Sequence, residues 1–231
     1  MTVLAFAAES ALLDIEGTIS PQTYVRDVLF PYSRARLAEF VREREGAFEV
    51  ASILEDARRE SGRDDAVAAL LDWQDRDVKA TPLKALQGLI WERGYAAGDF
   101  ASPIYPDALA ALRRWRDSGV RLYVYSSGSV KAQDLFFRYS ASGDLRLLFS
   151  GFFDTTSGPK TESSSYRRIA NQIGAPPADI VFFSDSVGEL AAAEGAGLQV
   201  AHVVKDGAAR DLRWRPVDDF ADVDFAPRAP R

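Results

Sequence analysis

Four short apolar segments, each ending at a small or acidic residue, constrain the fold of this chain more than any other feature. They comprise residues 10–13, 120–125, 151–153 and 180–183. Short apolar segments bounded by polar residues are typical of strands buried on both faces. Residues between them show helical periodicity, at 107–117, 130–139, 162–173 and 187–196, and residues 198–203 have the pattern of a further strand. This alternation predicts an α/β fold with a Rossmann-like parallel sheet and right-handed crossover connections.

A long helical segment interrupts this alternation after the first predicted strand. Apolar side chains recur there at helical spacing, for example Leu37, Phe40 and Val41, which is the pattern of amphipathic helices. Pro21 and Pro103 mark its two ends because proline interrupts regular structure. We therefore predict a helical cap at residues 20–103, inserted into an α/β core made of residues 1–19 and 104–231.

Charge and composition exclude several classes of function. The formal net charge is -6 at pH 7, which argues against nucleic acid as a partner because nucleic acid requires clustered Lys and Arg. The chain has no cysteine, which excludes disulfides and thiolate catalysis and is compatible with a reducing compartment. We expect no signal peptide or membrane span, because the apolar start is interrupted by Glu9 and no apolar run is long enough. These properties favour a cytoplasmic protein that acts on a small molecule.

Two acidic clusters follow predicted strands. Asp14 and Glu16 stand two residues apart after the first strand, and Asp185 follows the strand at 180–183. The first cluster alone could be a polar turn, with Thr18 as a helix cap. The carboxyl ends of parallel strands lie at one edge of a sheet, where ligands bind. Several carboxylates gathered there would require a hard cation with oxygen ligands, so the sequence predicts a magnesium site.

Two further segments are candidates for binding a phosphate group. Ser126 and Ser127 begin a Ser-Ser-Gly-Ser segment before a predicted helix, and Lys160 follows the strand at 151–153. Serine before a helix is often only an N-cap, and a lysine in a loop is usually solvated. Their positions after strands favour a functional role, because hydroxyls and helix N-terminal amides bind anions.

These motifs, in this order, resemble those of the haloacid dehalogenase superfamily of phosphohydrolases over nearly the whole chain. Most phosphatases of that superfamily have Asp at the second acidic position, where this chain has Glu16. Together with residues 25–32, Val-Arg-Asp-Val-Leu-Phe-Pro-Tyr, this feature is similar to the enolase-phosphatase family of methionine salvage. Further segments that match this family are residues 125–129, 158–162, 183–185 and 189–193. The resemblance implies a haloacid dehalogenase-like core with an inserted cap.

The resemblance also implies roles for the acidic residues. Asp14, Glu16 and Asp185 would bind one Mg²⁺ per subunit, and Asp14 would be the nucleophile that forms an aspartyl phosphate. Glu16 would protonate the leaving oxygen and then activate the hydrolytic water. Glu189, one helical turn after Asp185, is expected to orient a metal-bound water.

The substrate and the reaction follow from the same resemblance. Ser126, Ser127 and Lys160 would hold a small phosphate ester, with Lys160 offsetting charge during phosphoryl transfer. The reaction would be that of acireductone synthase, catalysed by a monomer. It would enolise 2,3-diketo-5-methylthiopentyl-1-phosphate and dephosphorylate it to 1,2-dihydroxy-3-keto-5-methylthiopentene.

Two alternatives remain open from the sequence. One is another small-molecule phosphatase of the haloacid dehalogenase type. The other is a non-catalytic binding module on the same fold. The second alternative leaves unexplained why Asp14, Glu16, Lys160 and Asp185 are all present, because a module without chemistry has no use for the whole set.

Overall fold

The computed structural model describes residues 3–207, 210–211 and 213–226 of the chain. Residues 1–2 and 227–231, at the ends of the predicted core segments, lie outside the described residues. Internal contacts divide the chain into two compact units, one formed by Met1–Gln22 with Ser102–Arg231 and the other by Thr23–Ala101. Each unit has its own hydrophobic core, so each is described separately.

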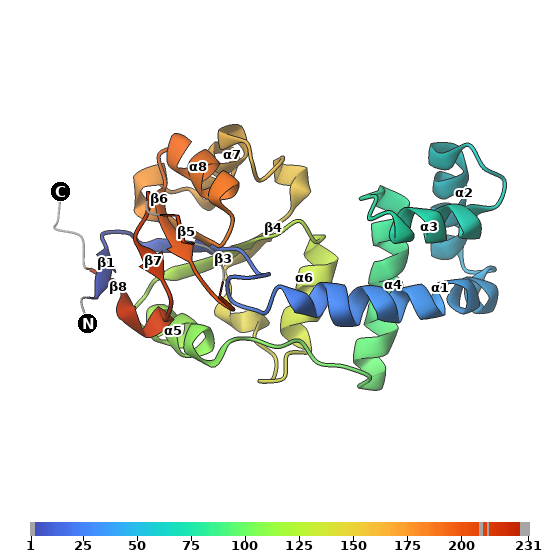
Figure 1. The fold of residues 1–231 in the computed structure, drawn as a ribbon, viewed down its shortest axis with the longest axis horizontal. Coiled ribbons are helices and arrows are strands. Elements are labelled where there is room, and N and C mark those ends of the chain that lie inside the picture. Colours follow the sequence, from blue (N-terminus) through green and yellow to red (C-terminus); the bar gives the residue numbers. More distant parts are fainter. Residues whose placement is uncertain (1–2, 208–209, 212, 227–231) are drawn as a thin grey trace. The chain divides into compact units, whose positions relative to one another are not determined.

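The first unit is built on a six-stranded sheet in which every pair of neighbouring strands is parallel (Figure 1). The strand order is β4-β3-β2-β5-β6-β7. The strands are β2 (Ser10–Leu13), β3 (Arg121–Tyr125), β4 (Gly151–Phe153), β5 (Ile180–Ser184), β6 (Gln199–Val203) and β7 (Pro216–Val217). This topology confirms the predicted α/β class with its parallel sheet. A separate two-stranded sheet pairs β1 (Leu4–Phe6) with β8 (Val223–Phe225), and the sequence pattern did not predict it.

Four helices cover the two faces of the six-stranded sheet (Figure 1). They are α5 (Pro106–Asp117), α6 (Val130–Arg138), α7 (Ser163–Ile173) and α8 (Val187–Gly195). Side chains of α7 and α8 pack on the face that contains Leu12 and Phe182. On the opposite face, Trp115 of α5 stacks on Phe183 with ring centroids 5.3 Å apart. Adjacent residues of β5 therefore contribute to different layers, as the two-residue period of a strand requires.

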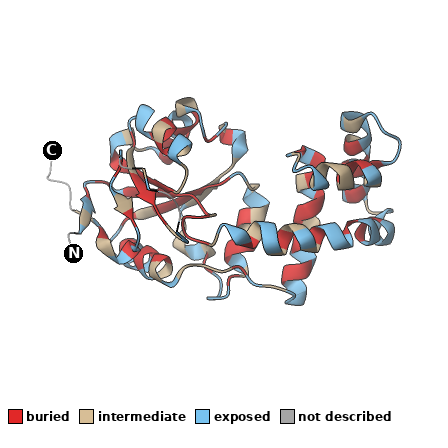
Figure 2. Cartoon of the chain, in the orientation of Figure 1, coloured by how far each residue is buried: buried red, intermediate tan, exposed pale blue. Residues whose placement is uncertain are grey.

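The extent to which a strand is buried depends on its place in the sheet (Figure 2). All residues of β2 and β5, in the middle of the sheet, are buried. All three residues of β4 are only partly buried, because this strand lies at the edge of the sheet. Short 3₁₀ turns connect these elements at Arg146–Leu148, Thr155–Ser157, Pro177–Asp179 and Phe220–Asp222.

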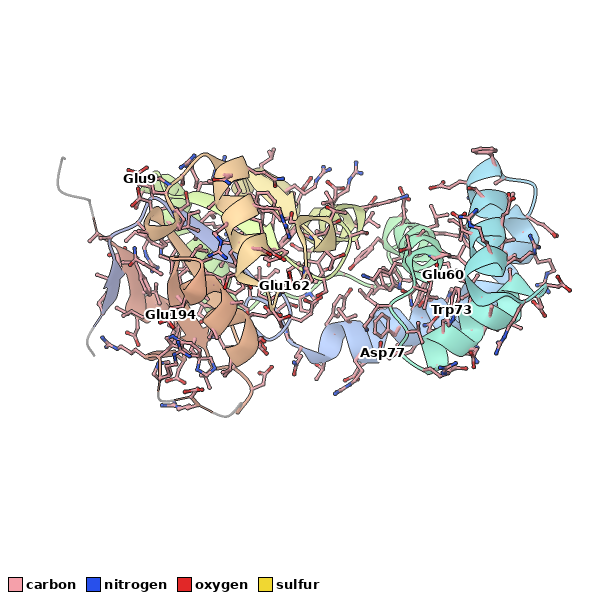
Figure 3. The ribbon with its side chains drawn as sticks, turned by 90° about the horizontal axis from the view of Figure 1, so that it is seen from above. Glu9, Glu60, Trp73, Asp77, Glu162 and Glu194 are labelled. Atoms are coloured by element: carbon pink, nitrogen blue, oxygen red, sulfur yellow. The ribbon has the colours of Figure 1, made fainter. Side chains whose placement is uncertain are left out.

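The second unit is entirely helical in the residues assigned to regular structure. A π-helical turn, Val25–Leu29, leads into α1 (Phe30–Arg44), α2 (Phe48–Ser61), α3 (Ala66–Asp75) and α4 (Thr81–Ala97). Leu37, Leu70 and Leu86 are fully buried in its core, which also includes Ile53. Trp73 of α3 packs against this core from the outside (Figure 3).

The ends of these helices follow from local sequence. Pro82 lies in the first turn of α4, where the missing N–H has no helical partner to lose, whereas Pro31 lies at the start of α1 directly after the π-helical turn. Asp65 caps α3 by accepting a hydrogen bond from the amide of Ala68. Among the described residues, we find no helix that combines the length and apolar character required to span a membrane.

Candidate active site

The candidate site lies at the carboxyl ends of the central strands. Asp14 directly follows β2, which pairs with β3 on one side and β5 on the other. Its amide donates a hydrogen bond of 3.0 Å to the carbonyl of Phe183, which extends the pairing of β2 and β5 by one step. Because Asp14 lies two residues beyond Leu12, its side chain continues on the face covered by α7 and α8.

Three charged groups meet on that face, of which Asp14 and Lys160 are buried and Glu189 is partly buried. The Lys160 ammonium lies 2.6 Å from Oδ1 of Asp14 and 2.7 Å from Oε2 of Glu189. The exposed fractions of the three side chains are 6% for Lys160, 7% for Asp14 and 15% for Glu189. Burial alone would lower the pKa of Lys160, but attraction by Asp14 and Glu189 outweighs it and raises this pKa. Lys160 therefore stays cationic and fixes both carboxylates.

Ser184, the last residue of β5, links the same two carboxylates. Its Oγ lies 3.2 Å from Oδ2 of Asp14 and 3.1 Å from Oε2 of Glu189, and it accepts a hydrogen bond from the amide of Ser186. A hydroxyl has one proton, so Ser184 donates to one carboxylate at a time. Ser184 was not among the predicted site residues, although its position beside Asp185 was a usable signal.

Asp185 is placed by the turn that follows Asp14. Its amide donates to Oγ1 of Thr18 at 3.2 Å. Gly17 has φ +73°, and a Cβ built on it would lie 2.2 Å from Oδ2 of Asp185. The Asp185 carboxylate therefore lies against the backbone of the Asp14–Thr18 turn, and only glycine at position 17 leaves room for it.

Mutual repulsion among the carboxyl groups changes their acidity. Burial, together with the nearby charge of Asp14, raises the pKa of Glu16 to about 7. The same two causes raise the pKa of Asp185 to about 6 and that of Glu189 to about 7. The single positive charge of Lys160 therefore does not neutralise all the carboxylates gathered around it.

This charge imbalance fits a bound divalent cation. Among residues 3–207, 210–211 and 213–226, no three acidic, histidine or cysteine side chains form a ready-made metal cluster. Magnesium does not require one, because it commonly binds one or two carboxylates and keeps several waters or substrate phosphate oxygens. Asp14, Glu16 and Asp185 supply the hard oxygen donors that such an ion prefers.

The Ser126 segment forms a second, neutral part of the site. The side chain of Ser126 is buried, and its Oγ accepts a hydrogen bond of 3.1 Å from the amide of Gly128. Ser127 is exposed, and Ser129 caps α6 through the amide of Ala132. The buried side chain of Gln133 donates to the carbonyls of Gly128 and Phe153, each at 2.9 Å.

These contacts indicate different roles for Ser126 and Ser129. Accepting the Gly128 bond leaves the hydroxyl proton of Ser126 for a second partner. Ser129 acts as an N-cap, the structural alternative that we had considered for the whole segment. Gln133, which ties the segment to the end of β4, was not predicted, because an isolated glutamine on a helix carries no sequence signal.

The sequence is similar to those of known hydrolases. The sequence model of a hydrolase family, described as haloacid dehalogenase-like hydrolase, matches residues 9–197. The chain is 54% identical to enolase-phosphatase E1 of a Bradyrhizobium species, over 96% of each chain. It is 44% identical to enolase-phosphatase E1 of Aquifex aeolicus, over 94% of this chain and 99% of that one.

Solved structures extend the comparison to the fold. The crystal structure of the UTR4 protein of Saccharomyces cerevisiae matches with a TM-score of 0.79 at 34% identity, covering 92% of this chain and 98% of that one. CbbY from Rhodobacter sphaeroides, solved in complex with phosphate, matches with a TM-score of 0.60 at 16% identity, over 93% and 95% of the two chains. The second similarity concerns the fold alone.

Proposed function

The chain belongs to the haloacid dehalogenase-like hydrolases and, within them, to the enolase-phosphatases, and on this premise we propose that Asp14 is its catalytic nucleophile. The reaction of this enzyme class converts 2,3-diketo-5-methylthiopentyl-1-phosphate to 1,2-dihydroxy-3-keto-5-methylthiopentene and phosphate in methionine salvage. The observation that carries the assignment of Asp14 is its buried carboxylate, held by Lys160 at the end of the central strand.

The surroundings of Asp14 orient it for attack on phosphorus. Oδ1 is held by the ammonium of Lys160 at 2.6 Å and by the amide of Ile15 at 2.8 Å, whereas Oδ2 is within reach of the Ser184 hydroxyl. With Oδ1 engaged on two sides, Oδ2 is the oxygen that attacks. The bond that forms joins Asp14 to phosphorus, the bond that breaks is the ester bond to the substrate oxygen, and the product is an aspartyl phosphate.

Attack by a carboxylate on a phosphate ester brings negative groups together. Magnesium, on which enolase-phosphatases generally depend, supplies positive charge at the phosphoryl oxygens when it is bound. Asp14, Glu16 and Asp185 would hold the ion. Lys160 contributes a second, permanent positive charge, which stabilises the transferring phosphoryl group.

Glu16 is proposed as the proton carrier. A group that first gives a proton and then takes one works best when its pKa lies near the working pH. Burial and the charge of Asp14 raise the pKa of Glu16 to about 7. Glu16 would protonate the leaving oxygen, then remove a proton from the water that attacks the aspartyl phosphate. A carboxyl with both forms populated could also move the proton in the enolisation step.

Ser126 and Ser127 are proposed to bind the substrate phosphate. The hydroxyl proton of Ser126 can donate to an anion at the end of β3, whereas the amides of Val130 and Ala132 already donate to Asp154 and Ser129. Glu189 would support the reaction by holding Lys160 and by orienting a water on the metal ion. We further propose that the enzyme acts as a monomer in the cytoplasm, as the family resemblance implies.

The test of this function is an assay with the natural diketo phosphate. Purified protein is mixed with the substrate, with and without Mg²⁺, and phosphate release is followed together with the ultraviolet absorbance of the enediol. We expect Mg²⁺-dependent formation of both products. Phosphate release from generic esters, with none from the diketo phosphate, would remove the substrate assignment and leave only phosphatase chemistry.

A further inference from the structure

Two buried tyrosine hydroxyls hold the loop that carries Lys160. Oη of Tyr125, the last residue of β3, donates to the carbonyl of Gly158 at 2.8 Å. Oη of Tyr166, on α7, donates to the carbonyl of Lys160 itself at 2.7 Å. Both tyrosines are 0% exposed. The loop is therefore hydrogen-bonded to the sheet on one side and to a helix on the other.

The rings behind these hydroxyls have little freedom to move. The rings of Tyr125 and Tyr166 meet edge to face, with centroids 5.5 Å apart at an angle of 81°. Tyr166 also contacts Phe182 edge to face at 5.1 Å. All three belong to the core beneath α7 and α8. A close-packed core fixes ring positions, so each hydroxyl oxygen is a fixed point against which the loop is placed.

Other contacts also shape the loop, including a turn in which the amide of Glu162 donates to the carbonyl of Pro159 at 3.1 Å. Gly158 has φ +119°, and a Cβ on it would lie 2.1 Å from Nη2 of Arg168 and 2.3 Å from Oγ of Ser165. Arg168 donates through Nε to the carbonyl of Ser157 at 2.7 Å. These contacts fix the start of the loop, up to Gly158. The carbonyl of Lys160 is held by Tyr166.

Tyr125 also acts through its ring. The ammonium of Lys160 lies 5.7 Å from the centroid of Tyr125 and 6.0 Å from that of Phe182, near the limit of a cation–π interaction. Tyr125 therefore acts on the loop twice, through its hydroxyl on the carbonyl of Gly158 and through its ring beside the ammonium of Lys160. This arrangement favours one position of the ammonium, between Asp14 and Glu189.

We propose that Tyr125 and Tyr166 are positioning residues for Lys160, which fix its ammonium at the phosphoryl-transfer site through hydrogen bonds to the loop carbonyls. The inference rests on the proposed function of Lys160. Positioning matters because a displacement of about 1 Å at a catalytic group can cost roughly 100-fold in rate. Removing a phenolic oxygen leaves a buried carbonyl without its donor, and the loop relaxes to find another.

The experiment measures kcat and KM for the diketo phosphate in Tyr125→Phe, Tyr166→Phe and the double variant. The control is Tyr123→Phe, a change of the same kind at a buried residue of the same strand and core. We expect kcat to fall about 10-fold in each single variant and about 100-fold in the double variant, with KM changed less than threefold. Tyr123→Phe should retain the wild-type kcat.

A second set of variants separates positioning from a general effect on folding. The tyrosine changes are repeated in a Lys160→Ala background, under single-turnover conditions with enzyme in excess so that slow rates can be measured. If the tyrosines act through Lys160, they cost less than twofold there. Equal losses in both backgrounds, or wild-type kcat in the double variant, would overturn the proposal. Full activity of Lys160→Ala itself would instead refute the proposed function of Lys160 in phosphoryl transfer.

Discussion

The unusual acidity of the site predicts that the metal-free protein loses stability as the pH rises through neutrality. Glu16 has a pKa of about 7 in the folded protein against an ordinary value of 4.5, so the folded state holds this proton more tightly than the unfolded chain. Stability from a raised pKa is fully present below the unfolded value and is lost as pH rises through the folded value. The affected interval therefore runs from about pH 4.5 to somewhat above 7.

The magnitude follows from the size of the shift. One pKa unit corresponds to about 1.4 kcal/mol, so Glu16 alone accounts for about 3 kcal/mol between pH 5 and pH 8. Asp185 and Glu189 are raised as well, to about 6 and about 7. Their shifts share the repulsion of Asp14, so they do not add in full to that of Glu16. We expect a total loss on the order of 3 to 5 kcal/mol.

The assay is urea denaturation at several pH values from 5 to 8 in the presence of EDTA. Glu16→Gln should reduce the pH dependence, because one of the three carboxyl groups with a raised pKa is gone. Glu60→Gln, at an exposed position on α2 (Figure 3), should leave it unchanged. Added Mg²⁺ should stabilise the protein more at pH 8 than at pH 5. A free energy of unfolding that stays flat or rises with pH in the metal-free protein would refute this reasoning.

Three further predictions concern single residues. Lys160→Ala should lower kcat about 1,000-fold and destabilise the protein by about 3 kcal/mol in thermal or urea denaturation, because two buried carboxylates lose their partner. Gly17→Ala should weaken Mg²⁺ binding about 10-fold by calorimetry, because its Cβ collides with Asp185, whereas Gly62→Ala, which has φ +68° and open space around it, should cost only about 1 kcal/mol of stability. Asp107→Asn breaks a 2.6 Å ion pair whose carboxylate is 24% exposed and should cost about 1 to 2 kcal/mol at pH 7. Burial opposes ionisation of Asp107, but its hydrogen bonds hold its pKa below the ordinary value, so this difference should disappear below about pH 4.

Much of the core fold could be predicted because its strands are buried and end abruptly. Residues 10–13 and 180–183 are fully buried, so their apolar runs stand out against the polar residues that follow. The two-stranded sheet of β1 and β8 could not be predicted in this way. Its strands have three residues each and include exposed positions such as Asp224. These strands are too short and too polar to give a periodic signal in the sequence.

The sequence predicts where in the fold the candidate site lies, but not which side chains contact one another there. That Asp14 and Asp185 follow strands places them at one edge of a parallel sheet. The spacing of Glu189 on a helix gives no indication that its carboxylate lies 2.7 Å from Lys160. Lys160 itself lies in an irregular loop with no periodicity, and its position depends on hydroxyls of Tyr125 and Tyr166 that the sequence pattern indicates only as core residues.

The central claim is that Asp14 becomes phosphorylated during turnover. The most direct measurement is an acid quench of enzyme mixed with the diketo phosphate and Mg²⁺, followed by mass spectrometry of the peptide that contains Asp14. We predict a phosphorylated peptide at Asp14 within the first turnover, and neither phosphopeptide nor phosphate release in Asp14→Asn. Appreciable turnover by Asp14→Asn, or a phosphoryl group on any other residue, would contradict the assignment.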